Sequence, residues 1–232
     1  GRVDLWLLDP GGLSESRTSV GGIVAGERVE LAVDVAIGHV RAIATTYRQV
    51  IVAADNGLFL WDLPFPRPTV QRPRLGPPPA IRGRVLASAR KFSSVAVSAD
   101  QVTFAAVEHP DPLATARAQV WLWKLDTAAR IGTQPLLETD GVRAIAFPPL
   151  RYFGIPQGEK PRPTLLAIAV GPGVRVVNPA TGETVASQVR DDDAPIYSLA
   201  FSPGGGVLAA GNDAGEIRVW DVALEPKLGL LP

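Results

Sequence analysis

Few side chains in this sequence belong to the types that carry out chemistry. It has no cysteine and two histidines, His39 and His109, so a zinc site built from thiolates or imidazoles has too few ligands. The acidic run Asp191, Asp192 and Asp193 lacks the alternating carboxylates and the later glutamate of a calcium loop. The glycines at 204–206 precede neither Lys nor Ser/Thr, so they predict a turn and no phosphate loop. We therefore expect no enzyme, no metal site and no cofactor, and no small-molecule substrate is evident.

Composition narrows the remaining function classes. The 23 basic residues balance the 23 acidic ones, so no overall field favours nucleic acid or an anionic membrane. No apolar run approaches the roughly 20 residues that span a bilayer. We expect a soluble, cytoplasmic protein with a sizeable core.

The secondary-structure elements that would position functional side chains are clearest after residue 204. Two short apolar runs, 207–210 and 217–222, flank Gly-Asn-Asp-Ala-Gly, whose residues tolerate positive φ and form local hydrogen bonds. The second run alternates between two faces with period two. This stretch therefore predicts a β-hairpin.

The hairpin is one copy of a repeated pattern. The segments VRAIAT, FSSVAV, VRAIAF and IYSLAF begin at Val40, Phe92, Val142 and Ile196, at spacings of 52, 50 and 54 residues. Each is followed by a second and a third apolar run, and a weaker fourth run precedes each cycle. The opening residues match only a third run. Four short strands per repeat predict an all-β fold.

This organisation resembles the Trp-Asp (WD) repeat β-propeller family over roughly residues 1–224. The resemblance rests on Trp-Asp pairs ending two third runs, on Gly38-His39 before an inner strand, and on Phe-Ser-Pro at 201–203 after another. It implies that the following residues are structural: His39, Asp55, Trp61, Asp62, Asp213, Trp220 and Asp221. The family's tetrad joins a His, a Ser or Thr, an Asp and a Trp. His39, Asp55 and Trp61 supply three members, whereas alanines occupy the hydroxyl position. We expect blades held mainly by apolar packing.

The repeats divide the chain into a partial unit at 1–27 and four complete four-stranded units at approximately 28–63, 64–126, 127–179 and 180–224. The sequence contains no Met, even at position 1. We expect a contiguous piece of a larger, seven-bladed propeller, and a closed five-bladed ring is the alternative. A propeller protects its sheet edges by closing into a ring.

Binding surfaces follow from the resemblance. Arg41, Ser93, Arg143 and Tyr197 each follow the first residue of an inner strand, which in this family lies near the top mouth of the channel. Arg and Tyr are common anchors of protein interfaces. We expect a partner-binding rim formed by Arg41, Arg143 and Tyr197 together with Asp191, Asp192 and Asp193. Simple solvation of these residues is the alternative.

A second feature is a basic, proline-rich insertion at 64–91. It has seven basic and no acidic residues, among them Arg67, Arg72, Arg74, Arg82 and Arg84, and seven prolines lie between 64 and 79. Such a segment favours an extended conformation and contact with an acidic partner, RNA or phospholipid. The alternative is an insertion whose arginines pair with acidic neighbours.

The sequence thus predicts a non-catalytic protein-protein interaction scaffold, or the recognition module of a larger regulatory protein, with an unidentified protein partner. Binding of nucleic acid or an anionic surface through the basic insertion is one alternative. A propeller enzyme with a site at the channel mouth is the other, but it needs clustered acids or histidines on one rim.

Overall fold

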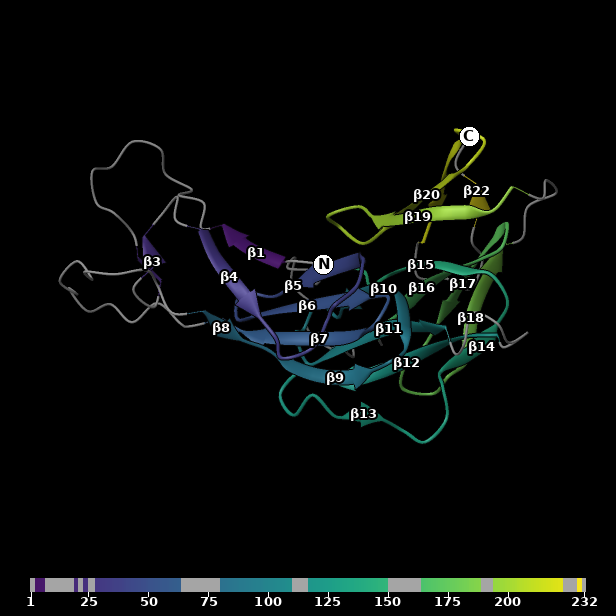
Figure 1. The fold of residues 1–232 in the computed structure, drawn as a ribbon. Helices are drawn as coiled ribbons and strands as arrows, with labels where there is room; N and C mark the ends of the chain where they lie inside the picture. Colours follow the sequence, from purple (N-terminus) through teal and green to yellow (C-terminus); the bar gives the residue numbers. More distant parts are fainter. Residues whose placement is uncertain are drawn as a thin grey trace, which may run out of the picture.

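The computed structural model describes residues 3–6, 19–20, 23–24, 28–63, 80–109, 117–149, 164–188, 194–222 and 229–230. All regular elements in these ranges are β-strands, as the sequence predicts. Most belong to four antiparallel sheets that follow one another in chain order, which we call blades one to four (Figure 1).

Each blade consists of an inner, a second, a third and an outer strand. Blade one contains β5 (Val40–Thr45), β6 (Gln49–Ala54), β7 (Gly57–Asp62) and β9 (Arg84–Ser88). Blade three contains β15 (Val142–Ala146), β16 (Leu166–Val170), β17 (Gly173–Val177) and β18 (Thr184–Gln188). Blade four contains β19 (Ile196–Phe201), β20 (Val207–Asn212), β21 (Ile217–Asp221) and β22 (Gly229–Leu230).

Blade two departs from the expected four strands. It contains β10 (Lys91–Val97), β11 (Thr103–His109) and β12 (Ala118–Lys124). Its outer position is divided between β13 (Arg130–Ile131) and β14 (Leu137–Thr139), which pair with opposite ends of β12. The sheet therefore has five strands.

A smaller sheet precedes blade one. In it β4 (Arg28–Ala32) pairs with β1 (Val3–Trp6) and, in parallel, with β8 (Ile81–Arg82). The short strands β2 (Ser19–Val20) and β3 (Ile23–Val24) form a separate pair. The placement of β8 and β9 corrects the expectation for residues 64–91, because the end of that segment is sheet rather than insertion.

The hairpin between β20 and β21 shows how local sequence closes each turn. The Asn212 side chain accepts a hydrogen bond from the Glu216 amide at 2.8 Å. Gly215 has a φ of 82°, a conformation that side chains with a Cβ rarely adopt. The predicted turn is therefore made by Asn212 and Gly215, while Asp213 is exposed at its tip.

Each blade has two faces of different character, because strand residues alternate between faces. The small face points toward the next blade and is defined here by two residues of the second strand and two of the third. These are Ile51, Ala53, Leu58 and Leu60 in blade one, Ala105, Val107, Val120 and Leu122 in blade two, Ala167, Ala169, Val174 and Val176 in blade three, and Ala209, Gly211, Ile217 and Val219 in blade four.

The large face points toward the preceding blade and carries bulkier side chains. Its members are Ile43, Val52, Phe59 and Trp61 in blade one, Val95, Phe104, Trp121 and Trp123 in blade two, Ile145, Leu166, Ile168 and Val177 in blade three, and Leu199, Leu208, Ala210 and Trp220 in blade four. Small and large faces of consecutive blades form the three main apolar clusters. Complete burial of one Leu, Ile or Phe contributes roughly 1.5–3 kcal/mol, so these contacts hold the blades in series.

Trp61 anchors the junction between blade one and the preceding sheet. It is fully buried, and its indole Nε1 donates a 3.1 Å hydrogen bond to the Ala32 carbonyl. The Gly83 amide donates to the same carbonyl at 2.8 Å. A Cβ added at Gly83 would lie 2.5 Å from Trp61 Nε1, so only glycine fits beneath the indole.

We expect Gly83→Ala to lower the free energy of unfolding by about 1–3 kcal/mol, because the new methyl group displaces a fully buried indole. Gly204→Ala is the matched control, since a Cβ there has no neighbour within 4 Å. Urea denaturation followed by tryptophan fluorescence measures both. Equal midpoints for the two variants would contradict this packing.

Candidate interaction rim

Each inner strand carries a β-bulge near its start, at the second residue of β5, β15 and β19 and at the third residue of β10. The pairing register shifts between Val40 and Ala42, and likewise at the equivalent positions of the other three inner strands. The bulged residues are Arg41, Ser93, Arg143 and Tyr197. A bulge leaves one residue outside the ladder and re-aims its side chain. The same backbone feature therefore recurs at all four predicted rim positions. We call the edge of the blades where β5, β10, β15 and β19 begin the entry rim.

In blade one the entry rim carries an ion-pair cluster around Asp55. Arg41 donates two hydrogen bonds to this carboxylate, from Nε at 2.8 Å and from a terminal nitrogen at 3.0 Å. His39 Nδ1 lies 3.1 Å from Oδ2, the carboxylate oxygen that also accepts from the terminal nitrogen of Arg41. The Arg41 hydrogen bonds chiefly hold the pKa of Asp55 at about 2, against an ordinary value of 3.8. Arg41 is thus pre-oriented with its side chain half exposed.

Blade two contributes a hydrogen-bonded pair. His109 Nε2 lies 2.7 Å from the Ser93 hydroxyl, joining the end of β11 to the bulge of β10. Burial lowers the pKa of His109, and the positive charges of Lys91 and Arg143 lower it further. His109 is the last residue of β11 and is half-buried.

Blades three and four meet at the entry rim through Arg143 and Tyr197. The Arg143 guanidinium carbon lies 4.5 Å from the centre of the Tyr197 ring. Both side chains are exposed, so the stacked pair presents a flat cationic and aromatic surface to solvent. The structure brings this predicted pair together. It leaves Arg41 in its own cluster, and Asp191, Asp192 and Asp193 lie outside the described residues.

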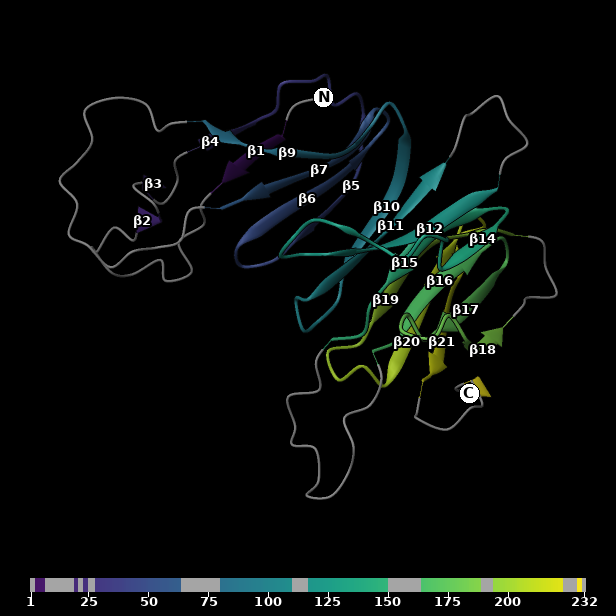
Figure 2. The ribbon, with the colours of Figure 1, turned by 90° about the horizontal axis from the view of Figure 1, so that it is seen from below.

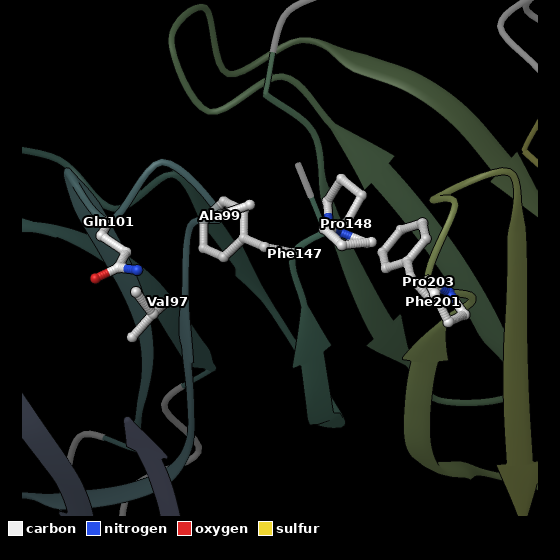
Figure 3. A pocket seen from close by; sticks show the side chains of 8 residues that line it. Val97, Ala99, Gln101, Phe147, Pro148, Phe201 and Pro203 are labelled. Atoms are coloured by element: carbon white, nitrogen blue, oxygen red, sulfur yellow. The ribbon is translucent and has the colours of Figure 1, made fainter. Parts of the chain in front are cut away.

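The opposite edge of the blades has a different character. A pocket of about 640 Å³ opens there, among the turns that follow β10, β15 and β19 (Figure 3). It is lined by Val97, Ala99, Gln101, Phe147, Pro148, Pro149, Phe201 and Pro203. These side chains offer apolar contact but neither an acid, a base nor a nucleophile.

The described part of the chain supports neither a metal site nor a membrane-spanning helix. It contains no group of three or more His, Cys, Asp or Glu residues arranged to hold a metal ion. Within the same residues, no helix has the length and apolar character needed to cross a membrane.

Comparison with known families identifies the repeat. The family described as WD domain, G-beta repeat matches residues 183–221, which include most of blade four and its Trp-Asp pair. Residues 183–221 therefore contain a WD repeat, and the series of antiparallel sheets in the other blades is consistent with the same family. A search of curated proteins finds no match to the chain. WD repeats generally serve as scaffolds that bind protein partners.

The WD motif residues form contacts that differ from the family's tetrad. His39 and Asp55 are joined, but Trp61 bonds to the Ala32 carbonyl and takes no part in their network. In place of hydroxyl residues, β6 ends in Ala53 and Ala54, both fully buried. The expectation of packing without complete polar networks is met in this blade.

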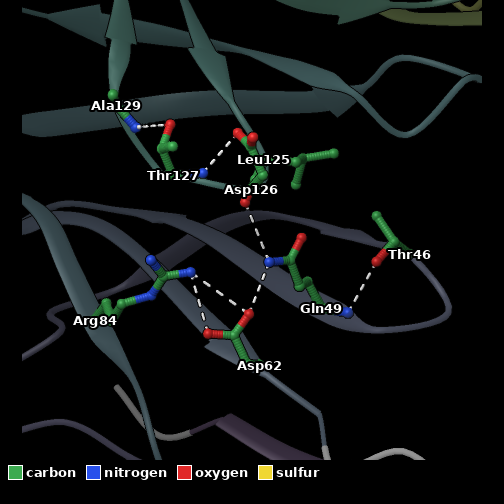
Figure 4. Close-up of polar contacts among 8 residues, drawn as sticks. All are labelled: Thr46, Gln49, Asp62, Arg84, Leu125, Asp126, Thr127 and Ala129. Carbon is green, nitrogen blue, oxygen red and sulfur yellow. Dashed lines mark hydrogen bonds and ion pairs between the residues drawn. The ribbon is translucent and has the colours of Figure 1, made fainter.

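Asp62, the acidic member of one Trp-Asp pair, accepts a hydrogen bond from Gln49, the residue that links blades one and two (Figure 4). The Gln49 amide donates to Asp62 at 2.7 Å and to the Leu125 carbonyl of blade two at 3.2 Å. Arg84 of the outer strand lies 3.1 Å from the same carboxylate. Trp220, of the other pair, is buried in the cluster between blades three and four, and Asp221 ends β21 beside it.

The basic segment does not form a free cationic patch where the structure describes it. Arg82 lies 3.8 Å from Asp34, Arg84 pairs with Asp62, and Arg90 pairs with Glu108. The alternative that arginines of this segment pair with acidic neighbours therefore holds for these three. Arg67, Arg72 and Arg74 lie outside the described residues.

Sequence reasoning missed the buried carboxylate of Glu108. This side chain has no exposed surface and pairs with Arg90 and, at 3.0 Å, with Arg130. The Arg130 guanidinium carbon also lies 3.9 Å from the centre of the Trp121 ring. The available signal was a single Glu closing the otherwise apolar run of β11, because a buried carboxylate requires charged partners.

The Arg41–Asp55 pair generates a pH prediction. Because the pKa of Asp55 is lowered in the folded state, its contribution to stability is complete above about pH 5 and is lost as pH falls toward 2. Arg41→Gln should raise the pKa of Asp55 toward 3.8, and His39→Ala should raise it less, since the Arg41 hydrogen bonds are the main cause. Carboxyl ¹³C NMR titration measures the pKa. An unchanged value in Arg41→Gln would refute the assignment.

Proposed function

We propose that this protein is a non-catalytic interaction module that binds a protein partner at the entry rim. The observation that carries the proposal is the repeated bulge, which places Arg41, Ser93, Arg143 and Tyr197 at one equivalent position in four consecutive blades. A rigid series of blades fixes the spacing of these side chains before binding. Less conformational entropy is then lost when the partner binds.

Arg143 and Tyr197 form the centre of the proposed surface. Stacking on Tyr197 restrains the Arg143 side chain while its hydrogen-bond donors stay accessible. Arg and Tyr are enriched among the residues that dominate binding energy at protein interfaces. The Arg41 cluster and the Ser93–His109 pair extend the same surface over blades one and two.

The alternatives have less support. Binding of nucleic acid through the basic segment needs unpaired cations, yet Arg82, Arg84 and Arg90 are engaged with carboxylates. A propeller enzyme needs convergent acids or histidines. The entry rim offers instead an Asp55 held by Arg41 and a His109 whose lowered pKa favours the neutral form.

The proposal predicts that Arg143→Glu with Tyr197→Ala abolishes partner capture while leaving the fold intact. A matched control is Val102→Ala with Lys124→Glu, which alters two exposed residues at the opposite edge. Wild type and both variants serve as immobilised baits, and bound proteins are compared by quantitative mass spectrometry. A protein captured by wild type and control but lost from the rim variant is then purified.

For the purified partner, we expect the rim variant to raise Kd by roughly 30-fold or more, corresponding to about 2 kcal/mol for a central interface residue. Isothermal titration calorimetry gives this value. A partner that binds the rim variant as tightly as wild type, or that only the opposite-edge variant loses, would refute binding at the entry rim.

A further inference from the structure

Lys91, the last residue of the basic segment, differs from the arginines of that segment that pair with carboxylates. It begins β10 and lies directly opposite His109 in the ladder to β11. Cross-strand partners have Cβ atoms roughly 4.5–5.5 Å apart, so the two side chains are neighbours. Among the described residues, no carboxylate lies within ion-pair distance of the Lys91 ammonium group.

Three further side chains of the entry rim surround this lysine. The Ser93 hydroxyl lies 2.7 Å from His109 Nε2. Arg143 begins the next blade, and the inner strands β5, β10, β15 and β19 follow one another along the series of blades (Figure 2). The charges of Lys91 and Arg143 both lower the pKa of His109, so both lie within electrostatic reach of its ring. We call these four residues the donor cluster.

The carboxylates in this part of the rim already face arginines. Arg41 holds Asp55 with two hydrogen bonds, and Glu108 pairs with two arginines of blade two. Asp140 lies 3.9 Å from Arg117. In the part of the chain that the structure describes, Lys91 and Arg143 therefore have no carboxylate of their own. An anion placed between two such cations is attracted by both.

We propose that the donor cluster binds carboxylate side chains of an acidic segment of the protein partner. The inference rests on the proposed function, because it names the chemistry of a partner at the same rim. Lys91 and Arg143 donate charge-assisted hydrogen bonds, which are stronger than those between neutral groups. The Ser93 hydroxyl keeps its own hydrogen for the ligand when it accepts a hydrogen bond from His109.

The placement of the two cations favours several carboxylates over one phosphate group. The Arg143 guanidinium is stacked on the Tyr197 ring of blade four, whereas Lys91 lies at the start of blade two. Each cation is thus held on a different blade. A chain segment with successive Asp or Glu residues offers one carboxylate to each of them.

The pKa of His109 is a direct readout of an anion in the donor cluster. Imidazole NMR signals are followed against pH in the full 232-residue chain, with and without acetylated hexaglutamate, and the spectrum of His39→Gln assigns the His109 signal. We expect hexaglutamate to raise the pKa of His109 from its lowered value toward or above the ordinary 6.5, because nearby negative charge stabilises the imidazolium. Hexalysine should leave it unchanged.

Lys91→Gln tests the residue that carries the inference. We expect it to weaken hexaglutamate binding by roughly tenfold, because it removes a hydrogen bond between charged groups. Lys124→Gln is the matched control, since it makes the same change at an exposed lysine on the opposite edge and should bind as wild type does. Circular dichroism melts establish that both variants are folded.

Three results would overturn the proposal. The first is a wild-type chain in which hexaglutamate leaves the pKa of His109 unchanged, or equal affinities for wild type and Lys91→Gln. The second is tighter binding of inorganic phosphate than of hexaglutamate, which would indicate a phosphorylated partner. The third concerns the chain's own acidic run at 191–193, outside the described residues: roughly tenfold tighter hexaglutamate binding after all three Asp→Asn substitutions would make that run the occupant.

The probe separates this inference from the proposed function. A partner that is captured through Arg143 and Tyr197, together with no binding of hexaglutamate, would retain the proposed function and overturn the acidic segment. Hexaglutamate binding that depends on Lys91, together with no partner lost from the rim variant, would count against the proposed function alone.

Discussion

Apolar packing between the small face of one blade and the large face of the next is the interaction on which the rest of the structure depends. A sheet of four short strands buries little surface alone, so each blade requires a neighbour to be stable. Alanines on the small face, Ala53 in blade one, Ala105 in blade two and Ala167 and Ala169 in blade three, let a bulky large face approach closely. The same contact fixes the relative position of the inner strands. The spacing of Arg41, Ser93, Arg143 and Tyr197 is therefore a consequence of packing several residues away from them.

This packing takes the place of the polar networks typical of the family. The Trp61 indole satisfies its donor with the Ala32 carbonyl, which ties blade one to the preceding sheet rather than to Asp55. Trp123, its counterpart in blade two, has a buried Nε1 without a hydrogen-bond partner. A buried donor without a partner costs about 1–3 kcal/mol. Blade two has instead the pairing of Glu108 with two arginines, so different blades hold their polar groups by different means.

The sequence predicted the strands where apolar alternation was strong. The inner, second and third strands of all four blades lie where the repeated runs placed them, because a period of two follows directly from strand geometry. Outer strands were harder. The outer strands β13 and β14 of blade two and β9 of blade one follow charged or proline-rich residues. Each outer strand pairs along one edge only, so its apolar alternation is weak and the surrounding composition makes it hard to recognise. Arg84 appeared as one charge in a basic run, whereas its pairing with Asp62 depends on contacts across the sheet.

The candidate rim was predictable in position but not in detail. Repeat alignment placed Arg41, Arg143 and Tyr197 at equivalent positions, yet a bulge is a property of the pairing between two strands and leaves no mark in a single run. The alignment also could not show that Asp55 orients Arg41 while Tyr197 orients Arg143. In a protein of stacked repeats, stability is approximately a sum over units and their nearest-neighbour interfaces, and the end units need a cap. The β4 strand caps part of blade one. Leu31 of this strand lies in the same apolar cluster as Trp61, so the junction before blade one depends on the kind of contact that joins the later blades.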